Sequence, residues 1–264
     1  MTPIALTIAG SDSGGGAGIQ ADLKTFHAFG VFGTSALTAV TVQNTRGVSG
    51  VHPIPVDVVQ AQIAAVAGDL RPAALKTGML ATAELVRAVA GSIREHGLAK
   101  LVVDPVMVAT SGDRLLAFHA ERAIVEDLLP LAALVTPNLP EAAILVGQPV
   151  EDEGGMRRAA RRLVEMGAAA ALVKGGHLGG RELVDVLYDG REWRAWRRPR
   201  QDTRNTHGTG CTLSAAVAAG LAHGRPLARS VGDALDYVAR AIASAPGLGA
   251  GHGPLNHMIP GPGN

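Results

Sequence analysis

The sequence predicts an α/β fold around a mostly parallel sheet, and two of its features support this. Short apolar runs rich in Val, Ile and Leu alternate with longer segments of helical period over about 170 residues, which is typical of βαβ units. The dipeptide Asp189-Gly190 then joins two further strands and favours a tight antiparallel hairpin, which we expect at one edge of the sheet. Because α/β folds of this length are commonly single units, we expect residues 1–264 to form one domain.

The expected elements follow one another in the order that βαβ units require. Strands are expected at residues 4–9, 34–42, 74–77, 100–103, 133–136 and 170–174. Helices are expected between and after them, at residues 18–29, 56–67, 82–96, 121–129, 139–146 and 155–166. Strands 183–188 and 193–197 flank the expected type I′ turn, and helices 209–223 and 227–245 follow it. The Gly- and Pro-rich tail from Pro246 is expected either to be mobile or to fold over the sheet.

Composition and charge exclude several classes of partner. A formal net charge of +1 gives no field broad enough to hold nucleic acid or a membrane surface, and 3% aromatic residues are too few for a stacking platform. No apolar run approaches the roughly 18 residues that cross a bilayer, and no secretory signal is visible. The single cysteine, Cys211, excludes an internal disulfide framework and fits a reducing compartment. We expect a cytoplasmic protein.

Polar and glycine-rich segments follow the expected strands, where open parallel sheets bind their ligands. The first of them includes residues 16–21, which fit the dinucleotide fingerprint G-x-G-x-x-G/A. That fingerprint also needs an acidic residue about 20 positions on, and Gln43 occupies the place. The loop is not a Walker A motif either, because Gly16 and Ala17 stand where Lys and Ser/Thr belong. A loop for another small ligand and a purely structural turn remain as interpretations.

A second glycine-rich turn, His207 to Cys211, opens a helix. Gly208 and Gly210 would let the backbone approach an anion closely. The amides and the helix dipole at Thr209, Gly210 and Cys211 would stabilise charge developing on a transferring phosphoryl group. The alternatives are a tight turn without a ligand and a cysteine that serves only as a small apolar residue.

Charged and amide side chains at the ends of later strands are typical of a phosphate and metal site. Asn138 and Glu141 stand three residues apart at the start of a helix, so both can offer oxygen ligands to Mg²⁺, and Asp104 can join them. The alternative is a capping box formed by Asn138 and Glu141. Lys174 precedes two glycines and suits a phosphate group, although a solvated lysine would fit the same position.

Several blocks, in one order along the chain, closely resemble the hydroxymethylpyrimidine/phosphomethylpyrimidine kinases of thiamine biosynthesis, which are ribokinase-like. The matching blocks are residues 9–12, 15–24, 43–45, 76–79, 104–106, 136–138 with Glu141, 174–177, 207–212 and 251–255. The resemblance implies a three-layer ribokinase-like fold and a homodimer. It also implies ATP- and Mg²⁺-dependent phosphorylation of 4-amino-5-hydroxymethyl-2-methylpyrimidine to the monophosphate and then to the diphosphate.

The resemblance also assigns roles to individual residues. It implies that Gln43 hydrogen-bonds the aminopyrimidine, whose edge suits an amide that both donates and accepts. It implies a pocket shaped by Gly10, Asp22, Met79 and Val106. It implies Mg²⁺ roles for Asp104 and Glu141, ATP or phosphate roles for Lys174, Thr209 and Asn138, and catalytic roles for Gly208, Thr209, Gly210 and Cys211.

Cys211 departs from the wider superfamily, in which sugar kinases place an Asp as general base at this position. A thiol at a helix N-terminus can have its pKa lowered toward neutrality, so a thiolate base is one hypothesis, although nearby ATP phosphates would oppose that change. The second phosphorylation needs no base, since its nucleophile is a phosphate oxygen already ionised near neutral pH.

Two other functions fit parts of the same pattern. A pyridoxine or pyridoxal kinase would bind a similar ring with a hydroxymethyl arm. A nucleotide-binding regulator without kinase activity is a more remote alternative, because it would leave Asn138, Glu141, Lys174 and Cys211 unexplained.

Overall fold

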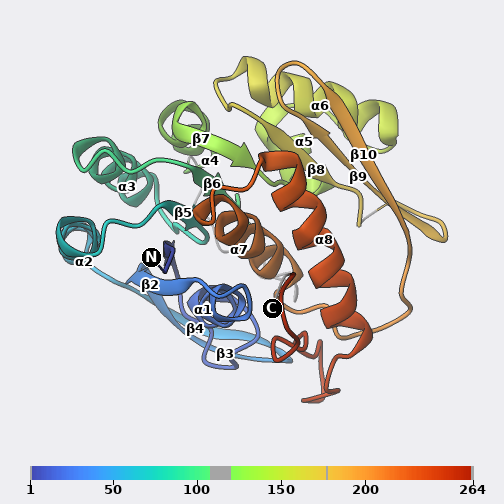
Figure 1. The fold of residues 1–264 in the computed structure, drawn as a ribbon, viewed down its shortest axis with the longest axis horizontal. Coiled ribbons are helices and arrows are strands. Elements are labelled where there is room, and N and C mark those ends of the chain that lie inside the picture. The colour runs from blue at the N-terminus through green and yellow to red at the C-terminus, as the bar shows by residue number, and fades with distance from the viewer. Residues whose placement is uncertain (1, 108–119, 177, 263–264) are drawn as a thin grey trace.

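The computed structural model describes residues 2–107, 120–176 and 178–262, and an eight-stranded sheet lies at its centre (Figure 1). The strand order is β10-β9-β8-β7-β6-β5-β1-β2. The strands are β1 (Ile4–Ala9), β2 (Phe32–Leu37), β5 (Ala74–Thr77), β6 (Leu101–Val103), β7 (Ala132–Val135), β8 (Ala171–Lys174), β9 (Glu182–Tyr188) and β10 (Trp193–Pro199). Strands β1, β2 and β5 to β8 are parallel, and β9 runs antiparallel to both of its neighbours. The predicted parallel sheet with an antiparallel edge hairpin is confirmed.

Helices cover both faces of this sheet and make three layers (Figure 1). One face carries α1 (Gly18–Ala28), α7 (Thr209–Ala222) and α8 (Leu227–Ala243). The other face carries α2 (Val56–Asp69), α3 (Ala83–Glu95), α4 (Ala120–Ala123), α5 (Leu139–Val146) and α6 (Glu153–Glu165). Small residues keep α7 thin enough to pack against the sheet, α1 and α8 together, and its positions 212–221 are all buried. Within the described ranges, no helix is both long and apolar enough to cross a membrane.

The region between α1 and α2 differs from the prediction of one strand at 34–42. The chain breaks at Thr38 into β2 and β3 (Ala39–Asn44), and β3 pairs with β4 (Gly47–Pro53) in a separate antiparallel sheet that the sequence analysis missed. Thr38 causes the break because its amide donates to the Ala9 carbonyl and its hydroxyl to the Met79 carbonyl, which ties it to the ends of β1 and β5. These contacts come from distant residues, so local propensity could not reveal them.

Two further elements are less regular than predicted. The expected helix at 121–129 is one α-helical turn, α4, followed by a π-helix (Ile124–Leu128) and a 3₁₀ turn (Leu129–Leu131), because Pro130 cannot continue the ladder of hydrogen bonds. The expected type I′ turn is wrong: Tyr188 pairs with Trp193, so the loop has four residues. Asp189 stabilises this loop by accepting hydrogen bonds from the amides of residues 191 and 192.

The C-terminal tail packs against the helix layer formed by α1, α7 and α8 on one face of the sheet. Leu255 is buried in that core, and the amide of Asn256 donates to the Ala241 carbonyl of α8. The Nε2 of His257 lies 2.9 Å from the hydroxyl of Thr212 on α7. Burial lowers the pKa of His257 to about 4, and the nearby charge of Lys24 adds to this effect. His257 is therefore neutral near pH 7, and it links the tail to the first turn of α7.

The tail should make folding stability depend on pH. Because His257 binds a proton less readily when folded than its ordinary pKa of 6.5 implies, stability is lost as pH falls from about 6.5 toward 4, by up to about 3 kcal/mol. Urea unfolding at pH 7 and pH 5 measures this loss. A His257→Gln variant should lose markedly less stability between the two values, and an unchanged pH dependence would contradict the assignment.

Candidate active site

A cavity of about 620 Å³ opens at the carboxyl ends of the parallel strands, a size and place usual for small-ligand sites. It is lined by all but one of the residues that the sequence analysis singled out: Gly10, Gln43, Met79, Asp104, Val106, Asn138, Glu141, Lys174, Gly208, Thr209, Gly210 and Cys211. The exception is Asp22. Segments that are up to about 200 positions apart in the chain therefore meet in one place. Open parallel sheets bind their ligands at such a place, beyond the carboxyl ends of the strands.

The turn before α7 leaves backbone donors facing the cavity. Gly208 has φ +82°, and a Cβ there would lie 1.8 Å from the Gly16 carbonyl oxygen, so only glycine fits. The amide and hydroxyl of Thr209 both donate to the Thr206 carbonyl, at 3.2 and 2.7 Å. In the described part of the chain, the amides of Gly210 and Cys211 have no such partner. The free donors are thus those two amides, whereas Thr209, which we expected to contribute a third, is occupied.

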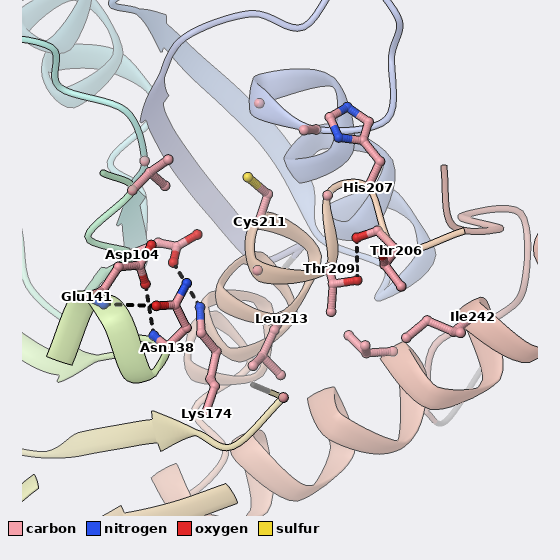
Figure 2. Close-up of a pocket in the computed structure, with 18 of the residues that line it drawn as sticks. Asp104, Asn138, Glu141, Lys174, Thr206, His207, Thr209, Cys211, Leu213 and Ile242 are labelled. Carbon is pink, nitrogen blue, oxygen red and sulfur yellow. Dashed lines mark hydrogen bonds and ion pairs between the residues drawn. The ribbon is translucent and has the colours of Figure 1, made fainter. Parts of the chain in front are cut away.

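Asp104 and Lys174 form a buried ion pair next to this turn (Figure 2). The Lys174 Nζ lies 3.4 Å from Asp104 Oδ1, and the hydroxyl of Ser214 on α7 donates to Asp104 Oδ2 at 3.2 Å. Burial works against the charge of Lys174, but Asp104 and Glu141 outweigh it and raise its pKa. A Cβ at Gly210 would come within 3.3 Å of the Lys174 Nζ, so the glycine lets the ammonium approach the turn. The pair provides a permanent cation beside two free amides.

Asn138 and Glu141 form the capping box that the sequence analysis held as an alternative. The Asn138 Oδ1 accepts the Glu141 amide at 2.9 Å, and Glu141 Oε2 accepts the Asn138 amide at 2.8 Å, at the start of α5. Burial raises the pKa of Glu141 to about 7; Lys174 opposes this rise and Asp104 reinforces it. The capping role does not exclude a ligand role, since the second carboxylate oxygen of Glu141 takes no part in the box.

Cys211 lies between His207 and the two carboxylates of Asp104 and Glu141 (Figure 2). Burial raises the pKa of its thiol to about 11; Lys76 opposes the rise, whereas Asp22 and Asp104 reinforce it. The expectation that the helix N-terminus lowers this pKa toward neutrality is therefore wrong for the ligand-free chain: removal from water dominates. At neutral pH the group is a thiol.

Asp22 lies behind the cavity and holds Lys76, a residue that sequence reasoning missed. The Lys76 Nζ is 2.9 Å from both carboxylate oxygens of Asp22, and the hydroxyl of Thr7 donates to Asp22 Oδ2 at 2.6 Å. Both charged side chains are fully buried, and Lys76 but not Asp22 lines the cavity. A lysine inside a strand that is otherwise apolar was the available signal. Asp22 thus shapes the cavity through Lys76.

The opposite wall of the cavity carries the side chains suited to a ring. On β3, Thr41 and Gln43 point inward while Val40 and Val42 are exposed on the other face. Met79 packs against Gly10, where a Cβ would lie 2.6 Å from the methionine methyl group. The wall therefore combines an amide with an adaptable apolar side chain.

The cavity continues over an apolar strip between α7 and α8. Leu213 comes from α7, and Leu235, Val238 and Ile242 come from α8. The same cavity is thus lined by this strip, by Gly210 and Cys211 and by the wall that carries Gln43. Figure 2 shows Leu213 and Ile242 of the strip on the side of the turn away from Asp104.

Comparisons with known proteins agree with this arrangement. The family described as phosphomethylpyrimidine kinase matches residues 12–256. The hydroxymethylpyrimidine/phosphomethylpyrimidine kinase of Rhizobium meliloti is 54% identical and covers 98% of both chains. The thiamine biosynthesis bifunctional protein of Geobacter sulfurreducens is 51% identical over 96% of this chain and 52% of its own length. A crystal structure of an ADP complex of Bacillus subtilis pyridoxal kinase superposes with a TM-score of 0.91 at 39% identity and covers 98% of both chains.

The fold agrees with these matches, since the expected ribokinase-like arrangement is confirmed in sheet order and layers. The match to the family spans nearly all of the chain, including the loop at Asp12 and the tail at Asn256. The chain belongs to the phosphomethylpyrimidine kinase family.

Proposed function

We propose that the chain uses ATP to phosphorylate 4-amino-5-hydroxymethyl-2-methylpyrimidine and then its monophosphate, in thiamine biosynthesis. One observation carries the proposal: a single cavity is lined by the Gln43 wall, by Gly210 and Cys211 with their free amides, and by an apolar strip. An acceptor ring and a nucleotide can therefore meet at these amides. The relatives named as kinases of this substrate support the choice of ring.

The substrate ring is held by the wall at β3. Gln43 offers a donor and an acceptor to the amino group and a ring nitrogen, while Met79 packs on the ring face and Gly10 leaves room for it. Val106 lines the cavity between this wall and Asp104 and completes the apolar surface. The hydroxymethyl arm would then extend toward Cys211.

The turn and Lys174 stabilise the transferring phosphoryl group. The amides of Gly210 and Cys211, with the dipole of α7, point at an anion near the helix start. Lys174, held by Asp104, adds a positive charge on the nucleotide side. Phosphoryl transfer depends mainly on such positioning and charge stabilisation. The apolar strip between α7 and α8 would hold the adenine.

The residues around Asp104 fit a magnesium ion held largely through water. In the described part of the chain, no three His, Cys, Asp or Glu side chains converge on one point, so a bound ion would keep several waters, as Mg²⁺ prefers. Asp104 and Glu141 would contact it, directly or through water. The raised pKa of Glu141, about 7, fits a carboxylate whose ionised form gains a cationic partner. The ion would neutralise phosphate charge.

We also propose that the chain is a cytoplasmic homodimer. Val40 and Val42 are 41% and 63% exposed on the outer face of the small β3–β4 sheet, and apolar side chains side by side on an uncovered sheet favour pairing with a second copy. The single cysteine and the use of ATP fit the cytoplasm.

A pyridoxal kinase is the second candidate, because a pyridoxal kinase structure superposes over almost the whole chain. Incubation with MgATP and hydroxymethylpyrimidine, its monophosphate, pyridoxine or pyridoxal separates the two, with products identified by mass. We expect a pyrimidine diphosphate from either pyrimidine. Turnover of pyridoxal alone would refute the proposal.

Cys211→Ala should slow the first phosphorylation more than the second. We propose that Cys211 first releases its own proton to solvent and that the thiolate then takes the proton of the hydroxymethyl oxygen, a contribution of roughly 10²-fold, whereas a phosphate oxygen needs no such help. Separate kcat/KM values with hydroxymethylpyrimidine and with its monophosphate measure the two steps, and Cys211→Ser serves as a near-isosteric control. Equal losses in both steps would count against a role as base.

Val42→Asp should convert the dimer to a monomer, because it places a charge in the middle of the proposed interface. Size-exclusion chromatography with light scattering at micromolar concentration measures the mass. Val58→Asp is a matched control, since Val58 is 44% exposed on α2, away from the β3–β4 sheet. A monomeric parent, or a dimeric Val42→Asp variant, would show that the interface lies elsewhere or does not form.

A further inference from the structure

The side chain of His207 has no role in the proposed reaction, although it is only 8% exposed. It lies on the side of the turn away from Asp104 and Glu141 (Figure 2). Its Nε2 is 2.8 Å from Asp12 Oδ2 and 3.5 Å from the side-chain amide of Gln43. Asp12 follows β1 and Gln43 lies on β3, so the imidazole connects the start of α7 to both parts of the ring-binding wall.

The contacts of Asp12 determine where the proton of His207 lies. Besides His207, the Asp12 carboxylate accepts hydrogen bonds from three backbone amides within residues 14–17, at 2.8 to 3.0 Å. Burial opposes the charge of Asp12, but His207 and these amides outweigh it and lower the Asp12 pKa. An ionised carboxylate only accepts, so Nε2 of His207 must carry a proton. The Gln43 amide therefore faces an N–H group.

The Gln43 amide has a second neighbour, the hydroxyl of Thr41, which lies 3.1 Å from Gln43 Oε1, while Gln43 Nε2 faces His207. The same hydroxyl is 2.7 Å from the Ser11 carbonyl oxygen, and it has a single proton, which goes to that carbonyl. Thr41 thus faces Gln43 with a lone pair. With Oε1 toward Thr41 and Nε2 toward His207, donor would face donor at His207 and lone pair would face lone pair at Thr41. Turning the amide by 180° joins a donor to an acceptor at both contacts, with the NH₂ group toward Thr41 and the carbonyl toward His207.

The orientation of the amide decides what the substrate ring meets. A side-chain amide has two N–H donors and two carbonyl lone pairs, so one of each remains for the ring. An aminopyrimidine offers the complementary pair, an amino donor beside a ring nitrogen that accepts. With the Gln43 carbonyl toward Thr41 instead, the amide would set donor against donor and acceptor against acceptor on the same ring. Buried polar groups left unpaired in this way weaken binding strongly.

We propose that His207 is a positioning residue that sets the orientation of the Gln43 amide and thereby makes the cavity selective for rings with an amino group beside a ring nitrogen. The inference rests on the proposed role of Gln43 in holding the ring. Asp12 acts one step behind, because its carboxylate keeps the proton on Nε2 of His207. The contact between His207 and Gln43 is long, so it acts by excluding the wrong orientation more than by a strong bond.

The test compares His207→Leu, which has no donor, with His207→Gln, whose amide can still donate to Asp12. Substrates are MgATP with hydroxymethylpyrimidine or with the analogue that lacks the amino group. We expect His207→Leu to raise the KM for hydroxymethylpyrimidine about tenfold, the ratio that 1.4 kcal/mol corresponds to, and to leave the KM for ATP within about twofold. Its preference over the analogue should fall by a similar factor, and His207→Gln should recover most of both.

Two further variants make every outcome informative. Gln43→Ala tests the underlying role: an unchanged KM for the pyrimidine would refute the contact between Gln43 and the ring. If Gln43→Ala raises that KM but His207→Leu leaves KM and preference unchanged, or if His207→Gln is no better than His207→Leu, the inference about His207 is wrong. His223→Leu removes a histidine that contacts the Phe29 carbonyl outside the cavity and should match the parent.

If thermal melting shows that His207→Leu is misfolded, Thr41→Val replaces it as the test of the inference. This variant removes the lone pair at the other end of the Gln43 amide without altering the turn. We expect it to lose preference for the amino-substituted ring in the same way. An unchanged preference would overturn the proposed mechanism.

Discussion

The active site depends on close backbone packing between the loop after β1 and the turn before α7. The carbonyl of Gly16 occupies the place of a Cβ at residue 208, and the imidazole of His207 lies where a Cβ at residue 16 would be. The Asp12 carboxylate then gathers the loop amides and the imidazole into one buried network. Because main chain meets main chain, the wall that carries Gln43 and the free amides of Gly210 and Cys211 are held together, as the proposed catalysis by positioning requires.

Charge in the cavity is arranged in buried pairs rather than as free ions. Lys76 is matched by Asp22, and Lys174 by Asp104. Burying such pairs is costly, and breaking one leaves an uncompensated charge. The pairs therefore keep the cavity close to neutral when it is empty, while each still presents a cation near the reacting groups. The same burial raises the pKa of the Cys211 thiol.

Much of the fold and the cavity could be predicted from the sequence because they follow from local rules. The alternation of apolar runs and helices predicted the sheet. Positions at strand ends and at a helix start indicated Asp104, Asn138, Glu141, Lys174 and residues 208–211, and the family resemblance added Gly10, Gln43, Met79 and Val106; all twelve line one cavity. What failed depended on distant contacts. The break at Thr38 is made by Ala9 and Met79, and the pairing of Lys76 with Asp22 spans 54 positions. The thiol pKa of Cys211 depends on how fully other segments bury it, which no local pattern encodes.

The two faces of β3 carry different tasks at adjacent positions. Gln43 lines the cavity and Thr41 is buried on the same side, whereas Val40 and Val42 are exposed on the outer face, and the pairing with β4 shifts by a bulge between Val42 and Gln43. A single inserted or deleted residue before this bulge would turn the Gln43 amide to solvent and a valine into the cavity wall. A change of length in this strand would therefore alter the cavity wall and the exposed outer face together, whereas an exchange of one side chain alters only one of them.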